Sequence, residues 1–371
     1  MIDERLPFAL QRVIARTMRR GRAVVVAIGN PLLDIITPVA NDQALPNGLQ
    51  WGSAVHLDAS RLEELCRQFS GSRYCAGGGS ANTVMALSDL GVRCGLIGAV
   101  GDDASAARYR GDLRQHGVNA ALQTVPGPSG RCLVLLAAQG GRAAVAAAPA
   151  AAAELDSGYV LRELSLRPDG HAPDAVFIEG FLLGRPQLVR GVLGATASGG
   201  ALTVMSLGHE AIVAARRTVI LEQILPAVDL LFANENEYRL LVGLDTTDDL
   251  TVQPLSRWSS RMPLAVITQA ERGATLLWAG GAVRRAAVSS AERNGDWKSV
   301  AGKRPEVSII DPTGAGDVFA GAFLAALFAG IRLEPALDAA NRAACASLTV
   351  YGGRIPPATC AALTRFLSQA R

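Results

Sequence analysis

Short apolar runs alternate with longer stretches of helical periodicity along most of the chain. The runs are rich in Val, Ile and Leu and mostly end in Gly or polar residues, which is typical of strands buried on both faces. They occupy 22–29, 94–101, 174–180, 201–208, 229–235 and 263–269. Helix-like spacing occupies 59–69, 80–91, 104–116, 185–198, 236–243 and 317–330. The alternation predicts an α/β fold, with a mainly parallel sheet flanked by helices.

Two segments interrupt this rhythm. Residues 35–51 and 119–148 lack long helical periodicity and contain short β-prone pieces such as RCLVLLAA at 131–138. We expect them to form a small β lid on one α/β domain that spans 22–371. Residues 1–21 precede that domain as an N-terminal extension, for which an amphipathic helix is one interpretation. The polar stretch 291–306 is typical of a surface insertion.

Composition limits the partners and the compartment. The formal net charge of +3 is spread along 371 residues, so we expect no basic stripe that would bind nucleic acid. This charge is compatible with a small anionic ligand. No run of about 18 apolar residues indicates a membrane span, and the first 20 residues lack a signal-peptide core. The six cysteines show neither paired nor metal-ligand spacing. We therefore expect reduced thiols and a cytoplasmic protein.

The stretch DPTGAGDVFAGAFL at 311–324 carries the clearest chemistry. Gly314, Ala315 and Gly316 lie between a predicted strand and a predicted helix, so their N–H groups would form an anion hole at the helix N-terminus. Asp317 would repel a phosphate as a ligand, but it could accept a hydroxyl proton as a general base. A tight turn followed by an acid that favours the helix dipole remains the alternative.

Two motifs in this order resemble those of the ribokinase/PfkB family of small-molecule kinases. DPTGAGDVFAGAFL is similar to the C-terminal signature of that family, and AGGGSANTVMALSDLGVRCGLIGAVGDD at 76–103 to its N-terminal one. The resemblance covers about residues 22–360 and implies a ribokinase-like fold with a small β lid. It implies a kinase that uses ATP and Mg²⁺, with Asp317 as catalytic base and 314–316 as the anion hole.

The resemblance also implies a substrate side and a nucleotide side. Gly78, Gly79 and Asn82 would line the acceptor pocket, and Asp34 would hold acceptor hydroxyls, although a turn or helix cap would explain either motif. The N-x-x-E motif in ANENE at 233–237 would place Asn234 and Glu237 near the phosphates and Mg²⁺, and the same pair could be a capping box. The expected ATP contacts are Thr268, Gly273 and Asn341. Two interpretations of Arg142 in the lid stay open: it contacts the phosphates, or it is a solvated surface arginine.

Some positions depart from the family pattern. Ala270 stands where a glycine is common, and SLGHEAIV at 206–213 replaces a frequent Ser-Asp-Pro. Other enzyme classes lack their motifs: there is no G-x-G-x-x-G after the first strand, no complete Walker motif and no G-x-S-x-G. A non-catalytic binding protein on the same fold stays as an alternative.

The sequence predicts the chemical class of the phosphate acceptor less specifically than it predicts the kinase reaction. GNPLLDI at 29–35 and FIEGFLL at 177–183 resemble adenosine-kinase-like members, and Trp51, Phe181 and Leu183 are candidates for a slot that holds a base. We expect phosphorylation of the primary hydroxyl of a nucleoside or ribose-type sugar, with a hexose or related sugar as the alternative. A homodimer is the candidate assembly.

Overall fold

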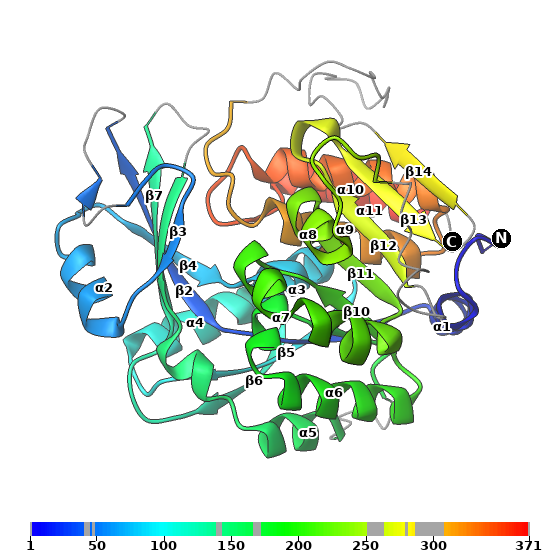
Figure 1. The fold of residues 1–371 in the computed structure, drawn as a ribbon, viewed down its shortest axis with the longest axis horizontal. Helices are drawn as coiled ribbons and strands as arrows, with labels where there is room; N and C mark the ends of the chain where they lie inside the picture. Colours follow the sequence, from blue (N-terminus) through cyan, green and yellow to red (C-terminus); the bar gives the residue numbers. More distant parts are fainter. Residues whose placement is uncertain are drawn as a thin grey trace.

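The computed structural model describes residues 2–40, 45–46, 49–138, 143–165, 172–250, 263–278, 281–285 and 308–369. Arg142 and the 291–306 stretch lie outside these residues. Figure 1 shows a large body and, at its left, a smaller sheet that stands against it.

The body is built on a nine-stranded sheet with the order β14-β13-β12-β11-β10-β9-β1-β5-β6. All pairings from β6 to β12 are parallel, whereas β13 and β14 are antiparallel to their neighbours. All six apolar runs are strands of this sheet, so the predicted mainly parallel α/β fold is confirmed. The strands are β1 (Val24–Ile28), β5 (Arg93–Val100), β6 (Asn119–Thr124), β9 (Ala175–Ile178), β10 (Leu202–Ser206), β11 (Leu230–Asn234), β12 (Leu264–Thr268), β13 (Ala274–Trp278) and β14 (Gly281–Arg285).

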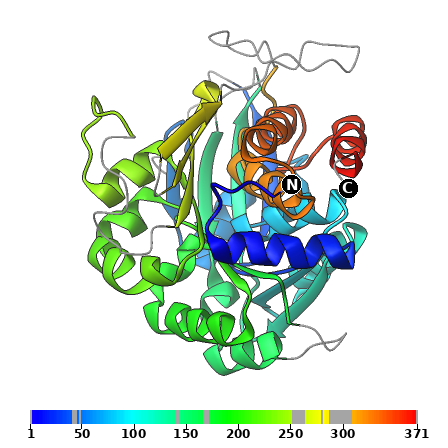
Figure 2. The same cartoon turned by 90° about the vertical axis from the view of Figure 1, so that its right-hand side faces the viewer.

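Helices cover both faces of the large sheet (Figures 1 and 2). On one face, the core cluster includes residues of α1 (Phe8–Arg20), α3 (Gly79–Asp89), α4 (Ala104–Gln115), α9 (Ala315–Phe328), α10 (Leu333–Ser347) and α11 (Pro357–Ser368). The opposite cluster includes residues of α5 (Ser157–Ser165), α6 (Pro186–Gly199), α7 (Glu210–Val219) and α8 (Glu235–Val242). Side chains alternate between the faces along each strand. Val25 therefore belongs to the first cluster and Ile28 to the second.

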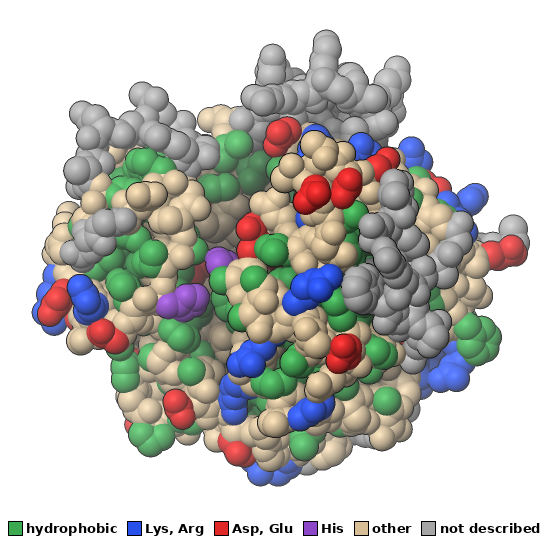
Figure 3. All heavy atoms as spheres, viewed as in Figure 1, with side chains coloured by type: hydrophobic (Ala, Val, Ile, Leu, Met, Phe, Trp, Pro, Cys, Tyr) green, Lys and Arg blue, Asp and Glu red, His purple; other side chains and the backbone are tan. Residues whose placement is uncertain are grey.

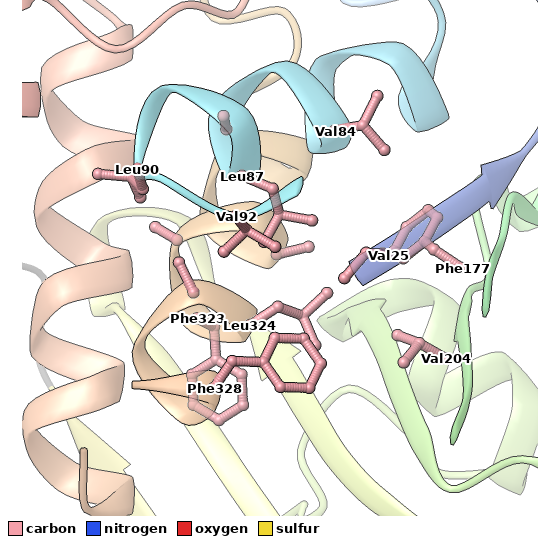
Figure 4. Packing of buried hydrophobic residues seen from close by; sticks show 14 of the residues in the cluster. Val25, Val84, Leu87, Leu90, Val92, Phe177, Val204, Phe323, Leu324 and Phe328 are labelled. Carbon is pink, nitrogen blue, oxygen red and sulfur yellow. The ribbon is translucent and has the colours of Figure 1, made fainter. Parts of the chain in front are cut away.

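Helix α9 lies at the centre of the first layer and is apolar on all sides. Figure 4 shows Leu87 of α3 and Leu324 of α9 in the same layer as Val25 of β1. Gly321 lets α3 and α9 approach, because a Cβ at this position would lie 2.7 Å from the Thr83 carbonyl oxygen. This packing holds the N-terminal turn of α9, with Asp317, beside the N-terminal turn of α3.

The smaller sheet has the order β3-β8-β7-β2-β4. Its strands are β2 (Leu32–Val39), β3 (Ala54–His56), β4 (Arg73–Gly77), β7 (Arg131–Ala137) and β8 (Ala143–Ala148). Helix α2 (Ala59–Cys66) packs on one face through Leu62 and Leu65. The other face, which we call the inner face, carries Ile36, Cys132 and Val134.

The expected boundaries of the lid were wrong at two places. Residues 119–124 form β6, which pairs in parallel with β5 at the edge of the large sheet. The smaller sheet instead includes β3 and β4, which the lid prediction did not contain. A short strand at an open edge has the same alternating pattern in either sheet, so the sequence did not distinguish the two.

The N-terminal extension is part of the body. Helix α1 buries Leu10, Val13 and Ile14 in the first core cluster, as its amphipathic pattern allows. Arg5 binds Asp3 and also Glu334 of α10, at 2.6 and 2.5 Å. No helix in the part of the chain that the structure describes is both long and apolar enough to cross a bilayer.

Candidate active site

The turn before α9 is held by Asp311, a buried acid for which the sequence predicted no role. One Asp311 oxygen accepts hydrogen bonds from the Thr313 N–H (2.9 Å) and Thr313 Oγ1 (2.6 Å), and the other accepts from the Gly352 N–H (2.8 Å). Gly314 follows with φ of 75°, and a Cβ there would lie 2.9 Å from Asn82 Nδ2. The strand expected just before this turn is absent from 308–311, within the described residues.

The first turn of α9 begins at Ala315, with Gly316 and Asp317 next. The first N–H groups of a helix have no intrahelical acceptor, so this turn presents donors and the positive end of the helix dipole. A Cβ at Gly316 would meet nothing within 4 Å, which leaves open space at this turn. The geometry fits the predicted anion hole, and its occupant stays a prediction.

Asp317 lies between the turn of α9 and the turn of α3. Its carboxylate accepts a hydrogen bond from Asn82 Nδ2 at 3.3 Å, and its carbonyl oxygen accepts one from Thr83 Oγ1 at 3.3 Å. A Cβ at Gly79 would lie 3.1 Å from Asp317 Oδ1. Although the side chain keeps some contact with solvent, desolvation raises its pKa to about 8, against the lowering effect of Asn82.

Three other carboxylates surround Asp317 and raise its pKa further: Glu179, Glu237 and Asp34. Burial also raises the pKa of each of these three to about 7. The cluster joins the ends of four elements that are distant in the sequence. Perturbed acids that converge in this way are typical of functional sites.

Glu179 is a member of this cluster for which the sequence predicted no role, although it lies in the FIEGFLL segment. It follows β9, and its Oε2 accepts hydrogen bonds from the Ser80 N–H at 2.9 Å and the Asn30 N–H at 3.4 Å. Gly29 makes room for this carboxylate, because a Cβ there would lie 2.2 Å from Glu179 Oε2. A buried acid at the end of an apolar strand was the available signal.

The glycines of AGGGSAN shape the acceptor side. Gly78 has φ of 90°, and a Cβ would lie 2.4 Å from the Asn30 carbonyl oxygen, so another side chain would be strained there. A Cβ at Gly77 would lie 2.1 Å from Asp34 Oδ2. Asp34 lies on β2, buried, with its carboxylate over the β4 backbone. The predicted residues Asp34, Gly78, Gly79 and Asn82 thus lie around one site with Asp317.

Arg354 links the side chain of Asn82 in α3 to the backbone of β4, and the sequence predicted no role for it. Its Nη1 donates to Asn82 Oδ1 at 3.0 Å, and its Nη2 donates to the Ala76 carbonyl oxygen at 2.6 Å and to Asp112 at 3.3 Å. Its charge lowers the pKa of Asp34 and partly offsets burial. Arg354 lies outside both motifs, so only the fold brings it here.

Asn234 and Glu237 form the capping box that was the alternative interpretation of the N-x-x-E motif. The Glu237 N–H donates to Asn234 Oδ1 at 2.8 Å, and the Asn234 N–H donates to Glu237 Oε2 at 2.9 Å. The same buried Glu237 acts electrostatically on Asp317, so capping does not exclude a role at the site. Among the described residues, no group of three or more His, Cys, Asp or Glu side chains is placed so that it could hold a metal ion by itself.

The residues expected on the nucleotide side lie at the end of β12, in the turn between β12 and β13, and within α10. Thr268 ends β12, and its Oγ1 donates to the Ala233 carbonyl oxygen at 3.4 Å. Gly273 has φ of 86°, and its carbonyl oxygen accepts from the Gln269 N–H at 2.8 Å. Ala270 adopts φ of 48°, a conformation that favours glycine. Asn341 is buried within α10, and its contact with ATP stays a prediction.

The seam between the two sheets holds an aromatic cluster. Phe181 lies 6.2 Å from His56 of β3 and 6.2 Å from His209, the N-cap of α7, measured between ring centroids. The three residues line a cavity of about 420 Å³. Figure 3 shows histidine side chains, in purple, at the hollow between the two lobes.

The other two residues proposed for a base slot lie elsewhere. Leu183 is buried in the core beneath α6 and α7, and Trp51 packs in the cluster on the α2 side of the smaller sheet. Both are apolar, and the sequence did not reveal which hydrophobic cluster each would join.

Comparison with known proteins agrees with this geometry. The model of the pfkB family of carbohydrate kinases matches residues 51–360. An adenosine kinase of Schizophyllum commune is 25% identical over 333 residues, which cover 88% of this chain and 94% of the relative. The crystal structure of adenosine kinase from Sinorhizobium meliloti has a TM-score of 0.77 and 25% identity, over 94% of this chain and all of that one.

A further structural neighbour supports the fold. The crystal structure of a probable sugar kinase from Rhizobium etli has a TM-score of 0.75 at 23% identity, over 94% of this chain and 98% of that one. The ribokinase-like fold, the family match and the acid at the N-terminus of α9 are mutually consistent. The chain belongs to the pfkB family of carbohydrate kinases, in its adenosine-kinase-like branch, and is a phosphotransferase that acts on a hydroxyl group of a nucleoside or sugar.

Proposed function

We propose that this kinase transfers the γ-phosphoryl group of ATP to the primary hydroxyl of a nucleoside, with Asp317 as the general base. The observation that carries the proposal is the position of Asp317. It lies one residue beyond an open glycine turn at a helix N-terminus and beside the glycines of α3, with its pKa raised to about 8. A base is most effective when its pKa lies near the working pH.

Phosphoryl transfer at this site forms one P–O bond and breaks another. The acceptor oxygen attacks the γ-phosphorus, and the bond from that phosphorus to the bridging oxygen of ADP breaks. Asp317 takes the hydroxyl proton and ADP leaves. The N–H groups of Ala315 and Gly316 stabilise the negative charge on the transferring group, since they are already oriented by α9.

The acceptor would lie between the two sheets. Asp34 and Asn82 supply groups that hold hydroxyls, and Phe181 supplies an aromatic face at the seam. The nucleobase of a nucleoside needs such an aromatic face, whereas a simple sugar does not. The adenosine kinases among the similar proteins favour the same class. A hexose or related sugar remains the second candidate, since the smaller sheet offers Asp34 to any polyol.

The residues present fit a magnesium ion held mainly by phosphates and water. Mg²⁺ keeps several waters and takes few protein ligands, so a three-residue cluster is not required. Glu237 is the carboxylate on the α8 side whose charge reaches Asp317. Bound there, Mg²⁺ would neutralise the phosphate charge that these acids would otherwise repel.

The Asp317→Asn variant tests the base. We expect turnover to fall at least about a hundredfold while ATP binding and folding are kept, because the amide preserves shape but accepts no proton. Glu222→Gln, which neutralises an exposed carboxylate far from the motifs, is the matched control. Turnover within tenfold of the wild type would rule out the base assignment.

The acceptor class is tested by ADP release over a panel of nucleosides and sugars at saturating ATP and Mg²⁺. A nucleoside should give the highest kcat/KM, and its phosphate should be on the primary hydroxyl by mass spectrometry and NMR. A hexose that exceeds all nucleosides would replace the first candidate by the second.

A further inference from the structure

The large sheet has a second hollow, at the end opposite the catalytic site. A cavity of about 610 Å³ lies at the amino ends of β1, β5 and β6. Parallel strands place their carboxyl ends at the catalytic site, so the length of β1 separates the two places by roughly 15 to 20 Å, at about 3.3 Å per residue. We call this cavity the basal groove. It is lined by Arg20, Arg22, Val24, Val26, Arg93, Cys94, Gly95, Gly117, Asn119 and Asp174.

The groove has an apolar floor and a basic rim. Val24 and Val26 of β1 supply its apolar lining, next to Gly95, where a Cβ would lie 3.5 Å from Val26 Cγ2. Among the described residues that line the groove, three are arginines and one, Asp174, is a carboxylate. The excess of positive charge favours an anion.

The Asp174 carboxylate already binds other groups, so it does not neutralise the positive charge of the groove. Its buried carboxylate binds Arg16 at 2.9 Å, lies 3.6 Å from Arg20 and accepts the Val24 N–H at 3.0 Å. Arg22 has neither a hydrogen bond nor an ion pair with any residue in the described part of the chain. Arg22 and Arg93 are exposed and border the same cavity.

We propose that the basal groove binds a small polyphosphate-bearing anion at a site separate from the catalytic one. Guanidinium groups hold phosphate oxygens through paired hydrogen bonds, and several around one cavity suit more than one phosphate. The volume lies in the range of small-molecule sites and admits a nucleotide as well as a free polyphosphate. A nucleotide would also cover the apolar floor formed by Val24 and Val26.

Titration calorimetry with tripolyphosphate, at low and physiological salt, tests the groove. We expect saturable binding to the wild type and at least tenfold weaker binding to Arg22→Ala and to Arg93→Ala. Arg12→Ala is the matched control, because it removes the same charge from an exposed face of α1 outside the groove. Absence of binding, unchanged binding in both groove variants, or equal weakening in Arg12→Ala would each overturn the proposal.

Hydrogen exchange locates the ligand and separates it from the catalytic site. Tripolyphosphate should protect the amides near 93–95 and 117–119 in the wild type, and this protection should be lost in Arg22→Ala. Protection confined to 266–277 and 311–317 would place the anion at the catalytic site and overturn the proposal. Repeating both measurements with ATP distinguishes the sources: tighter groove-dependent binding than tripolyphosphate means that the nucleoside contributes.

Discussion

The Asp317 carboxyl has a pKa of about 8 because it is desolvated and lies among Glu179, Glu237 and Asp34. Mutual repulsion keeps these acids from ionising together, so the proton is retained at neutral pH. Asn82 opposes this effect by donating a hydrogen bond to the ionised form. Burial and repulsion, opposed by the hydrogen bond from Asn82, thus set the fraction of enzyme in which Asp317 is ionised and can accept a proton.

The pH dependence of kcat/KM follows from this raised pKa. A base acts when ionised, so kcat/KM should rise as the pH increases through about 8 and fall below it. Glu179→Gln removes one negative neighbour and should move the rise to lower pH. Identical midpoints in the wild type and Glu179→Gln would contradict the electrostatic account, and Glu222→Gln should leave the midpoint in place.

Asp34 provides a second test at the scale of one residue. Asp34→Ala should weaken acceptor binding by about 1.5–3 kcal/mol, the usual contribution of hydrogen bonds to a charged group, and should leave ATP binding unchanged. Calorimetry measures both affinities, and Asp34→Asn should retain part of the acceptor affinity. Equal losses for acceptor and ATP would indicate that Asp34 supports the fold of β2 rather than the ligand.

Helix α8 shows how one element combines capping and chemistry. Its Asn234–Glu237 box satisfies N–H groups at the helix start while it holds Glu237 toward the site. The neighbouring turn after β12 contains Ala270 at φ of 48°. Both features lie at carboxyl ends of adjacent strands, where α/β sheets place their ligands.

Glu237→Gln separates the two roles of the capping box. The amide oxygen still accepts the Asn234 N–H, so thermal stability should stay close to the wild type. The Mg²⁺ concentration for half-maximal rate should rise several-fold, because a charged oxygen has been lost. Asn234→Ala should instead cost about 1 kcal/mol of stability through the lost cap.

Glu235→Gln is the matched control for this test, because the Glu235 carboxylate binds Arg239 and Arg272 instead of pointing to the site. An unchanged Mg²⁺ requirement in Glu237→Gln would leave this residue as a cap alone.

At the scale of the whole molecule, the smaller sheet faces the body across the acceptor side. Its inner face carries Ile36, Cys132 and Val134, together with Asp34 on the same side of β2. A kinase must exclude water while the phosphoryl group is transferred. We therefore expect the smaller sheet to close over the bound acceptor.

Hydrogen exchange measures this closure. Acceptor should protect β2, β7 and β8, whereas β6, which belongs to the large sheet, should exchange at the same rate with and without acceptor. ATP alone should protect mainly 266–277 and 311–317. Unchanged exchange in β2, β7 and β8 at saturating acceptor would indicate a fixed sheet, and β6 is the internal control.

The amino-acid sequence by itself determined the body of the fold and the identity of the central acid. Six apolar runs predicted six strands and the helical periodicity predicted the helices between them, because the buried faces of these elements follow a local period. The Gly-Ala-Gly-Asp order indicated an anion hole and a base, since both properties depend on neighbouring residues. Asp34, Gly78, Gly79 and Asn82 also lie around one site with Asp317, and their contact with the acceptor stays a prediction.

Only the tertiary structure decided which distant residues share the site. Arg354 reaches Asn82 across 272 positions and Glu179 reaches Ser80 across 99. It also decided that 119–124 joins the large sheet and that Leu183 and Trp51 pack away from the seam. Local periodicity tells which side of a strand or helix is buried, but the partner on that side is chosen by packing between segments far apart in the chain.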